Sequence, residues 1–171
     1  MSTSTPERTG VRPGRWTSTL LVLTGIASLV FTAGTAVQAF VVVDEQTLTR
    51  MMVVAGTPPG AAAEQVPGFL LGFRAVGCLY LVGNALGVLA LRGRPDRWLF
   101  WVVLITNATQ AAGVVMVPPA MSVAARERFG VVGALPSLVT DLGALVLVVV
   151  LVVASVATRA AWGQVRQQRT V

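Results

Sequence analysis

The chain has 171 residues, of which 54% are hydrophobic and 12% are charged, and its formal net charge is +6. Soluble domains carry about 25% charged residues, so this composition excludes an ordinary soluble domain and indicates a single membrane domain. The chain has no His and one Cys, Cys78. These counts exclude an intrachain disulfide and His-based catalytic triads. They also leave few ligands for a metal or a haem, so we expect neither a metal nor another cofactor.

Four apolar stretches are long enough to cross a bilayer, which takes about 20 mostly apolar residues. In chain order they cover residues 17–43, 67–91, 98–117 and 136–158. We therefore predict an all-α fold: an integral membrane four-helix bundle over residues 17–158. Polar tails precede it over residues 1–16 and follow it over residues 159–171.

Prolines and tryptophans mark the ends of these stretches. Pro67 and Pro136 stand where the first turn of a helix tolerates proline, and Pro118 is followed by a second proline that ends the third stretch. Tryptophan lies near several ends, as in the aromatic belts of membrane proteins. The residues concerned are Trp16, Trp98, Trp101 and Trp162.

The first stretch has two interpretations. A basic start, an apolar run over residues 20–31 and small residues near Ala39 are typical of a signal peptide that is cleaved. The apolar run continues to Val43, however, which is long enough to span a bilayer. An uncleaved helix is therefore the favoured interpretation, with cleavage as the alternative.

The arginines predict the orientation of the bundle. One side carries nine of them: Arg8, Arg12, Arg15, Arg92, Arg94, Arg97, Arg159, Arg166 and Arg169. The other side carries Arg50, Arg126 and Arg128. Positive charge accumulates in cytoplasmic loops, so we predict that both termini are cytoplasmic. Because the basic residues lie at the ends of apolar segments, they indicate membrane topology, and we expect no nucleic-acid partner.

The two outer loops contain segments of helical character. Residues 44–56 place Leu48, Met51 and Met52 at helical spacing behind an acidic start, and residues 122–130 have a similar pattern. We predict short helices here that lie on the membrane surface. Residues 56–67 are rich in Gly, Pro and Ala and are predicted to form a flexible loop.

Each apolar stretch contains one polar or charged residue at a similar depth. At 1.5 Å per residue, Gln38, Arg74, Gln110 and Asp141 all lie about 8–10 Å from the outer ends of their helices. A charge inside a membrane helix costs about 2.5–3.5 kcal/mol on insertion scales. We therefore expect Arg74 and Asp141 to form an ion pair with each other, and the two glutamines to lie beside that pair and form hydrogen bonds with it. Asn107 extends this layer one turn inward.

Two interpretations of this polar layer remain open. It could have a purely structural role and hold the helices together through polar contacts, or it could line a pocket that binds an anionic or polar headgroup or a small solute. No nucleophile–base arrangement accompanies it, so no catalytic residues are assigned.

The stretch GFRAVGCLYLVGNALGVLAL, residues 72–91, has an early Arg followed by spaced glycines. With four helices and cytoplasmic termini, it resembles the DoxX-like small four-helix membrane proteins of bacteria, over residues 67–158. That resemblance implies the four-helix fold, a bacterial plasma membrane, and a role related to quinone or to a redox complex.

Three hypotheses of function follow. The first is a non-enzymatic accessory or ligand-binding bundle, whose partners are the lipid bilayer and a small ligand, a lipid or a quinone. The second is a subunit of a small transporter or channel, which needs a membrane partner subunit to build a path. The third is a membrane enzyme or redox-complex subunit that acts on lipid or quinone.

Overall fold

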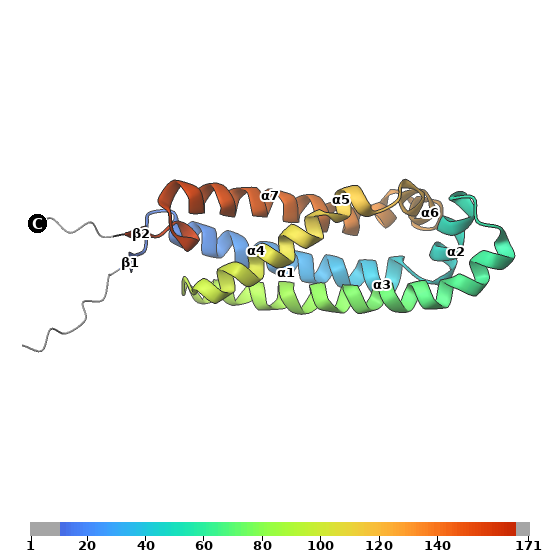
Figure 1. Cartoon of the computed structure of the whole chain (residues 1–171), viewed down its shortest axis with the longest axis horizontal. Helices are drawn as coiled ribbons and strands as arrows, with labels where there is room; N and C mark the ends of the chain where they lie inside the picture. The colour runs from blue at the N-terminus through green and yellow to red at the C-terminus, as the bar shows by residue number, and fades with distance from the viewer. Residues whose placement is uncertain (1–10, 167–171) are drawn as a thin grey trace, which may run out of the picture.

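The computed structural model of the chain describes residues 11–166. Within these residues, four helices are long and apolar enough to cross a membrane. The long helices α1 (Thr17–Val37), α3 (Pro59–Gly87), α4 (Arg97–Ala111) and α7 (Leu135–Thr158) form a bundle (Figure 1). The predicted helical four-segment fold is therefore confirmed. Predictions for residues 1–10 and 167–171, including Arg8 and Arg169, lie outside the described residues.

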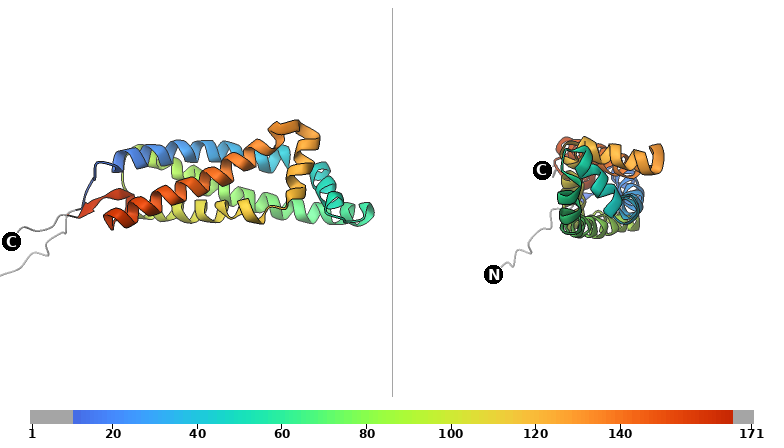
Figure 2. Two further views of the ribbon diagram at one scale, coloured as in Figure 1. Left: turned by 90° about the horizontal axis from the view of Figure 1, so that it is seen from above. Right: turned by 90° about the vertical axis from the view of Figure 1, so that its right-hand side faces the viewer.

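Shorter elements connect and extend the long helices. They are β1 (Val11–Arg12), the π-helix η1 (Gln38–Val42), α2 (Glu45–Val54), η2 (Val88–Arg92), α5 (Gly113–Met116), α6 (Pro119–Phe129), η3 (Gly130–Ala134), η4 (Ala161–Gly163) and β2 (Val165–Arg166). β1 and β2 pair antiparallel, with Val11 opposite Arg166, so the two described ends of the chain meet at one end of the bundle. α2 and α6 cover the opposite end (Figure 2).

Helix α3 begins earlier than the sequence predicts. It begins at Pro59 rather than at Pro67, so the flexible loop predicted for residues 56–67 is wrong from Pro59 onward. Pro58 is extended at the N-cap and Pro59 occupies the first turn, where its missing N–H costs nothing. Burial of Ala62 and Val66 offsets the backbone hydrogen bond that Pro67 lacks inside the helix.

Helices α2, α6 and the first two turns of α3 (residues 59–66) form what we call the cap. The two short helices predicted in the outer loops are present as α2 and α6. Leu48, Met51 and Met52 of α2 are buried in a core shared with α3 and α6. The apolar face of α2 therefore packs against protein, whereas the sequence placed it on a membrane surface, because periodicity does not identify what a face contacts.

A second core lies within the bundle, and small residues let its helices approach closely. Its buried members are Leu21, Phe31, Ala90, Leu99, Phe100, Val103, Ala144, Leu147, Leu151 and Trp162. A Cβ on Gly87 of α3 would lie 2.2 Å from Ser28 Oγ of α1, so only glycine fits at this contact.

Trp162 belongs to this core and not to an interfacial belt, which corrects one of the four tryptophan predictions. Its side chain is fully buried, and its Nε1–H donates to the Asp96 carbonyl at 2.8 Å. Its ring meets that of Phe100 edge to face, with centroids 5.4 Å apart. The buried ring gains apolar contacts while its N–H keeps a partner, which fastens η4 to the start of α4.

Candidate functional site: a cavity beneath the cap

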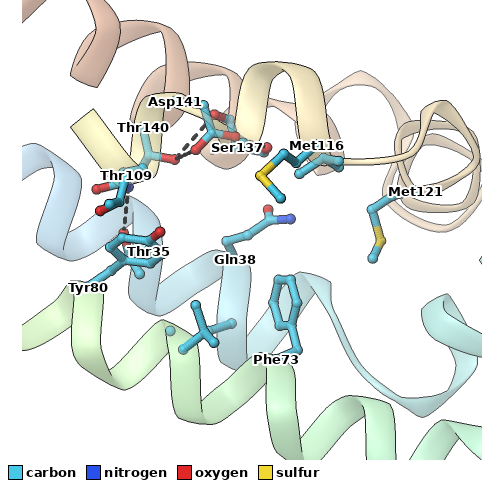
Figure 3. A pocket seen from close by; sticks show the side chains of 16 residues that line it. Thr35, Gln38, Phe73, Tyr80, Thr109, Met116, Met121, Ser137, Thr140 and Asp141 are labelled. Carbon is cyan, nitrogen blue, oxygen red and sulfur yellow. Dashed lines mark hydrogen bonds between the residues drawn. The ribbon is translucent and has the colours of Figure 1, made fainter. Parts of the chain in front are cut away.

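A cavity of about 310 Å³ lies beneath the cap. Its walls come from α1 and η1, α3, α4 and α5, α6, and α7 (Figure 3). Its size is at the lower end of the range for small-molecule sites, about 300–1,000 Å³, and its lining is mostly apolar. The polar members are Thr35, Gln38, Tyr80, Thr109, Gln110, Ser137, Thr140 and Asp141.

Asp141 is the charged group of the cavity. Ser137 Oγ donates to Asp141 Oδ2 at 2.9 Å, and Thr140 Oγ1 donates to Oδ1 at 3.1 Å. Both donors belong to α7, the helix that carries the carboxylate. Gly113 lies against the other side: a Cβ there would be 3.0 Å from Oδ2, so a larger residue would press on the carboxylate.

Gln38 lies where α1 changes into the π-helix η1. Val43 N–H donates to the Gln38 carbonyl at 3.0 Å across this wider turn. The side chain reaches into the cavity between Asp141 on one side and Phe73 on the other (Figure 3). Its Oε1 is buried and has no hydrogen-bond partner within residues 11–166. Single π-turns are frequent at functional sites, and a buried acceptor without a partner is costly.

Gln110 is different, because its amide is bonded at both ends. Asn84 Nδ2 donates to Gln110 Oε1 at 3.0 Å, and Gln110 Nε2 donates to Thr35 Oγ1 at 3.3 Å. This chain joins α3, α4 and α1 at the edge of the cavity. Asn107, one turn further from the cap, is buried outside the cavity lining and donates to the Val103 carbonyl at 2.8 Å. Gln110 therefore links three helices, whereas the hydrogen bond of Asn107 stays within α4.

Arg74 does not pair with Asp141, which corrects the predicted ion pair. The ion pairs formed among the described residues are Arg50–Glu127 and Arg128–Asp44. The Arg74 guanidinium carbon lies 5.9 Å from the centroid of the Phe40 ring, on η1, and Arg74 Nε is buried without a hydrogen-bond partner in the described chain.

The periodicity of α3 explains this separation. The face of the helix that lines the cavity consists of Phe73, Val76, Gly77 and Tyr80. Successive residues of an α-helix are about 100° apart, so Arg74 projects to another side than Phe73. Spacing in the sequence sets the depth of each residue and its angle relative to others on the same helix, but not which side of that helix faces its neighbours, so two residues at one depth can point in different directions.

The mouth of the cavity lies between α3 and the α4–α5 segment. The most exposed lining residues are Met116 of α5, at 77%, and Val76 of α3, at 50%; Thr109 of α4 is also exposed. The cap closes the end of the bundle above the cavity, where Met121 of α6 is buried. The cavity therefore opens sideways through the wall of the bundle.

Two ion pairs tie α6 to α2 within the cap. Arg128 binds Asp44, which also caps α2 by accepting from Thr47 N–H at 2.9 Å. The hydrogen bond from the Arg128 guanidinium lowers the pKa of Asp44 from 3.8 to about 2, against the opposing effect of partial burial. Arg50 Nη2 donates to Glu127 Oε1 at 3.0 Å. These outer charges have their partners, in contrast to Asp141.

Of the five residues that the sequence predicts for the polar layer, the cavity brings three together: Gln38, Gln110 and Asp141. Arg74 and Asn107 lie outside its lining. Sequence reasoning missed Ser137, Phe73 and Met116. Ser137 could have been found, because it precedes Asp141 by one helical turn on the same face; nothing in the sequence distinguishes Phe73 or Met116 from ordinary apolar residues.

The chain matches no protein-family model, no curated protein and no solved structure. The resemblance to the DoxX-like proteins therefore stays a prediction.

Proposed function

We propose that this protein is an integral membrane protein that binds a small amphipathic molecule entering its cavity from the side. The observation that carries the proposal is the combination of a lateral mouth, an apolar lining and two acceptor groups: Asp141, which has hydroxyl partners but no counter-charge, and Gln38, whose Oε1 has no partner within residues 11–166. In a bilayer, a lateral mouth faces lipid, so a ligand can enter without crossing water. Its polar end would meet the acceptors while its apolar part stays in the hydrophobic lining.

The same proposal includes the location. Four apolar helices support a multi-pass protein, and the excess of arginine at the end where β1 and β2 pair supports cytoplasmic termini. The DoxX-like resemblance motivates the bacterial plasma membrane. Orientation can be tested by labelling Gln65→Cys and Arg94→Cys in a Cys78→Ser background on intact cells. Modification by an impermeant maleimide is expected at position 65 and not at position 94; the reverse pattern would invert the topology.

Ligand binding is tested by native mass spectrometry of the protein extracted in mild uncharged detergents. We expect the wild type to carry a small hydrophobic molecule. Met116→Trp, which fills the mouth, should lose it. Val115→Trp is the matched control, because Val115 is also exposed on α5 but does not line the cavity.

A bare wild-type mass in every detergent, together with no mass shift on addition of amphiphiles, would overturn the ligand-binding proposal. Equal loss of ligand from both tryptophan variants would also count against it, since α5 would then be disturbed as a whole.

A further inference from the structure

We infer that the ligand of this cavity carries an ammonium head, so that the site selects amphipathic amines over anions. This inference rests on the proposed ligand-binding function and specifies its chemical class. Four features of the cavity carry it: the charge of the lining, the free acceptors, the aromatic rings and the position of Arg74.

The first feature is charge. Among the described residues that line the cavity, Asp141 alone is charged. No arginine neutralises it, since the ion pairs of residues 11–166 involve other groups. A half-buried carboxylate whose partners are two hydroxyl groups lacks a counter-charge, and in an apolar surrounding a cation is the group that would stabilise it most. An anionic head would be repelled by the same carboxylate.

The second feature is the set of hydrogen-bond acceptors. Each Asp141 oxygen accepts one hydrogen bond from its own helix, while an ionised carboxylate offers about four acceptor positions in total. Gln38 Oε1 adds an acceptor that has no partner within the described chain. A primary ammonium has three N–H donors and no acceptor. The cavity and this head are therefore complementary in both charge and hydrogen bonding.

The third feature is the remainder of the lining. Phe73 and Tyr80 contribute aromatic rings, and Met116 and Met121 contribute polarizable thioethers. Organic cations are attracted to the faces of aromatic rings, and the same side chains accommodate hydrocarbon. An alkyl or aryl group attached to the ammonium thus has a matching surface beside the carboxylate.

The fourth feature is the position of Arg74, which the sequence had made the cationic member of the layer. With Arg74 beside Phe40 and outside the lining, the sign of the expected ligand reverses. An anionic headgroup was one expectation from the sequence; the cavity offers a carboxylate in its place.

The test compares three probes of equal chain length in dodecyl maltoside: octylammonium, octanol and octanoate. Calorimetric titrations are corrected with protein-free micelles. We expect octylammonium to bind wild type at least tenfold more tightly than octanol, and octanoate to bind least. Asp141→Asn should reduce octylammonium affinity to that of octanol. Asp96→Asn is the matched control, because it removes an exposed carboxylate remote from the cavity lining and should change nothing.

The ammonium group could belong to a free amine or to a lipid headgroup, and a second arm separates these sources. Native mass spectrometry compares phosphatidylethanolamine with phosphatidylglycerol of identical chains. Selective retention of the first indicates a lipid, whereas binding of octylammonium alone indicates a free amine; either supports the inference.

Two outcomes overturn it. If all three octyl probes bind equally and Met116→Trp abolishes all binding, the cavity binds amphiphiles without selecting amines, and the proposed function survives. If no probe and no lipid binds wild type, both proposals fail. Should Asp141→Asn not fold, the ranking of the three probes on wild type decides the question.

Discussion

The cap and the cavity beneath it each contain an aspartate that accepts hydrogen bonds, but only the aspartate of the cap is paired with a cation. In the cap, Arg128 and Asp44 bind each other, and Asp44 also caps α2. In the cavity, Asp141 has hydroxyl partners but no cation, and Gln38 has a buried acceptor without a partner. Polar groups that satisfy each other stabilise a fold, whereas groups that keep free acceptor positions in a cavity are available to a ligand.

The two regions also differ in what holds them together. The cap buries leucine and methionine side chains, which is favourable wherever the alternative is water. The long helices pack through small residues such as Gly87 against Ser28, the mode expected where lipid surrounds them and gives no hydrophobic drive to associate. The predictions below test this contrast, from the largest expected effect to the smallest.

Truncating the cap core should have the largest effect on stability. Leu48 is fully buried, and Leu48→Ala should destabilise the protein by about 2–5 kcal/mol through lost burial and a residual cavity. Thermal unfolding in detergent measures it. Val54→Ala, an exposed position of the same helix, is the control and should stay within about 0.5 kcal/mol of wild type. Similar losses in both variants would show that the cap is not an independent core.

Removing the N-cap of α2 should have the next largest effect. Asp44→Ala deletes the acceptor for Thr47 N–H and the partner of Arg128, and should cost about 1–2 kcal/mol. The measurement is the same unfolding assay. Asp44→Asn keeps a side-chain oxygen for the cap and should lose less. Equal losses in the two variants would mean that the ion pair, and not the cap, makes the difference.

The stability of the folded protein should depend on pH through the titration of Asp44. The Arg128 guanidinium lowers the pKa of Asp44 to about 2 in the folded protein, below its unfolded value of 3.8. A lowered pKa contributes stability that is complete above about pH 4 and is lost as the pH falls towards about 2. We expect wild type to lose about 1 kcal/mol more than Asp44→Asn over this range, after allowing for solvent screening. Parallel pH curves would contradict the shift.

The outer ion pair should contribute little. Arg50 and Glu127 are 49% and 43% exposed, so their pair should contribute little to stability, and that contribution should weaken with salt. A double-mutant cycle with Arg50→Gln and Glu127→Gln, run at low and high salt, measures it. A coupling that is insensitive to salt would indicate a buried pair.

The smallest effect is expected for the coupling free energy between Arg74 and Asp141. Because no ion pair joins them, Arg74→Ala and Asp141→Ala should be additive within about 0.5 kcal/mol in unfolding assays. A favourable coupling well above that value would restore the ion pair predicted from the sequence and would remove the counter-charge argument for an amine ligand.

The sequence by itself determined the four long helices, because apolar runs of this length have few other stable forms. It also located the two short outer helices from an acidic start and helical spacing, and it placed Gln38, Gln110 and Asp141 at a common depth from the rise per residue. Each of these predictions depends on local pattern or on distance along a helix.

The tertiary structure decided which side chains face the cavity, which face neighbouring helices and which are buried. The way the helices are rotated about their axes places Asp141 in the cavity lining and Arg74 beside Phe40. It also lets Gln110 form hydrogen bonds with Asn84 and Thr35. The Gln38 side-chain oxygen has no partner within residues 11–166. It also set the apolar face of α2 against protein and buried Trp162. The reason is physical: the apolar pattern along the chain sets which segments form long helices and how deep each residue lies. The direction of each side chain depends on how the helices pack, and that depends on contacts between residues far apart in the chain.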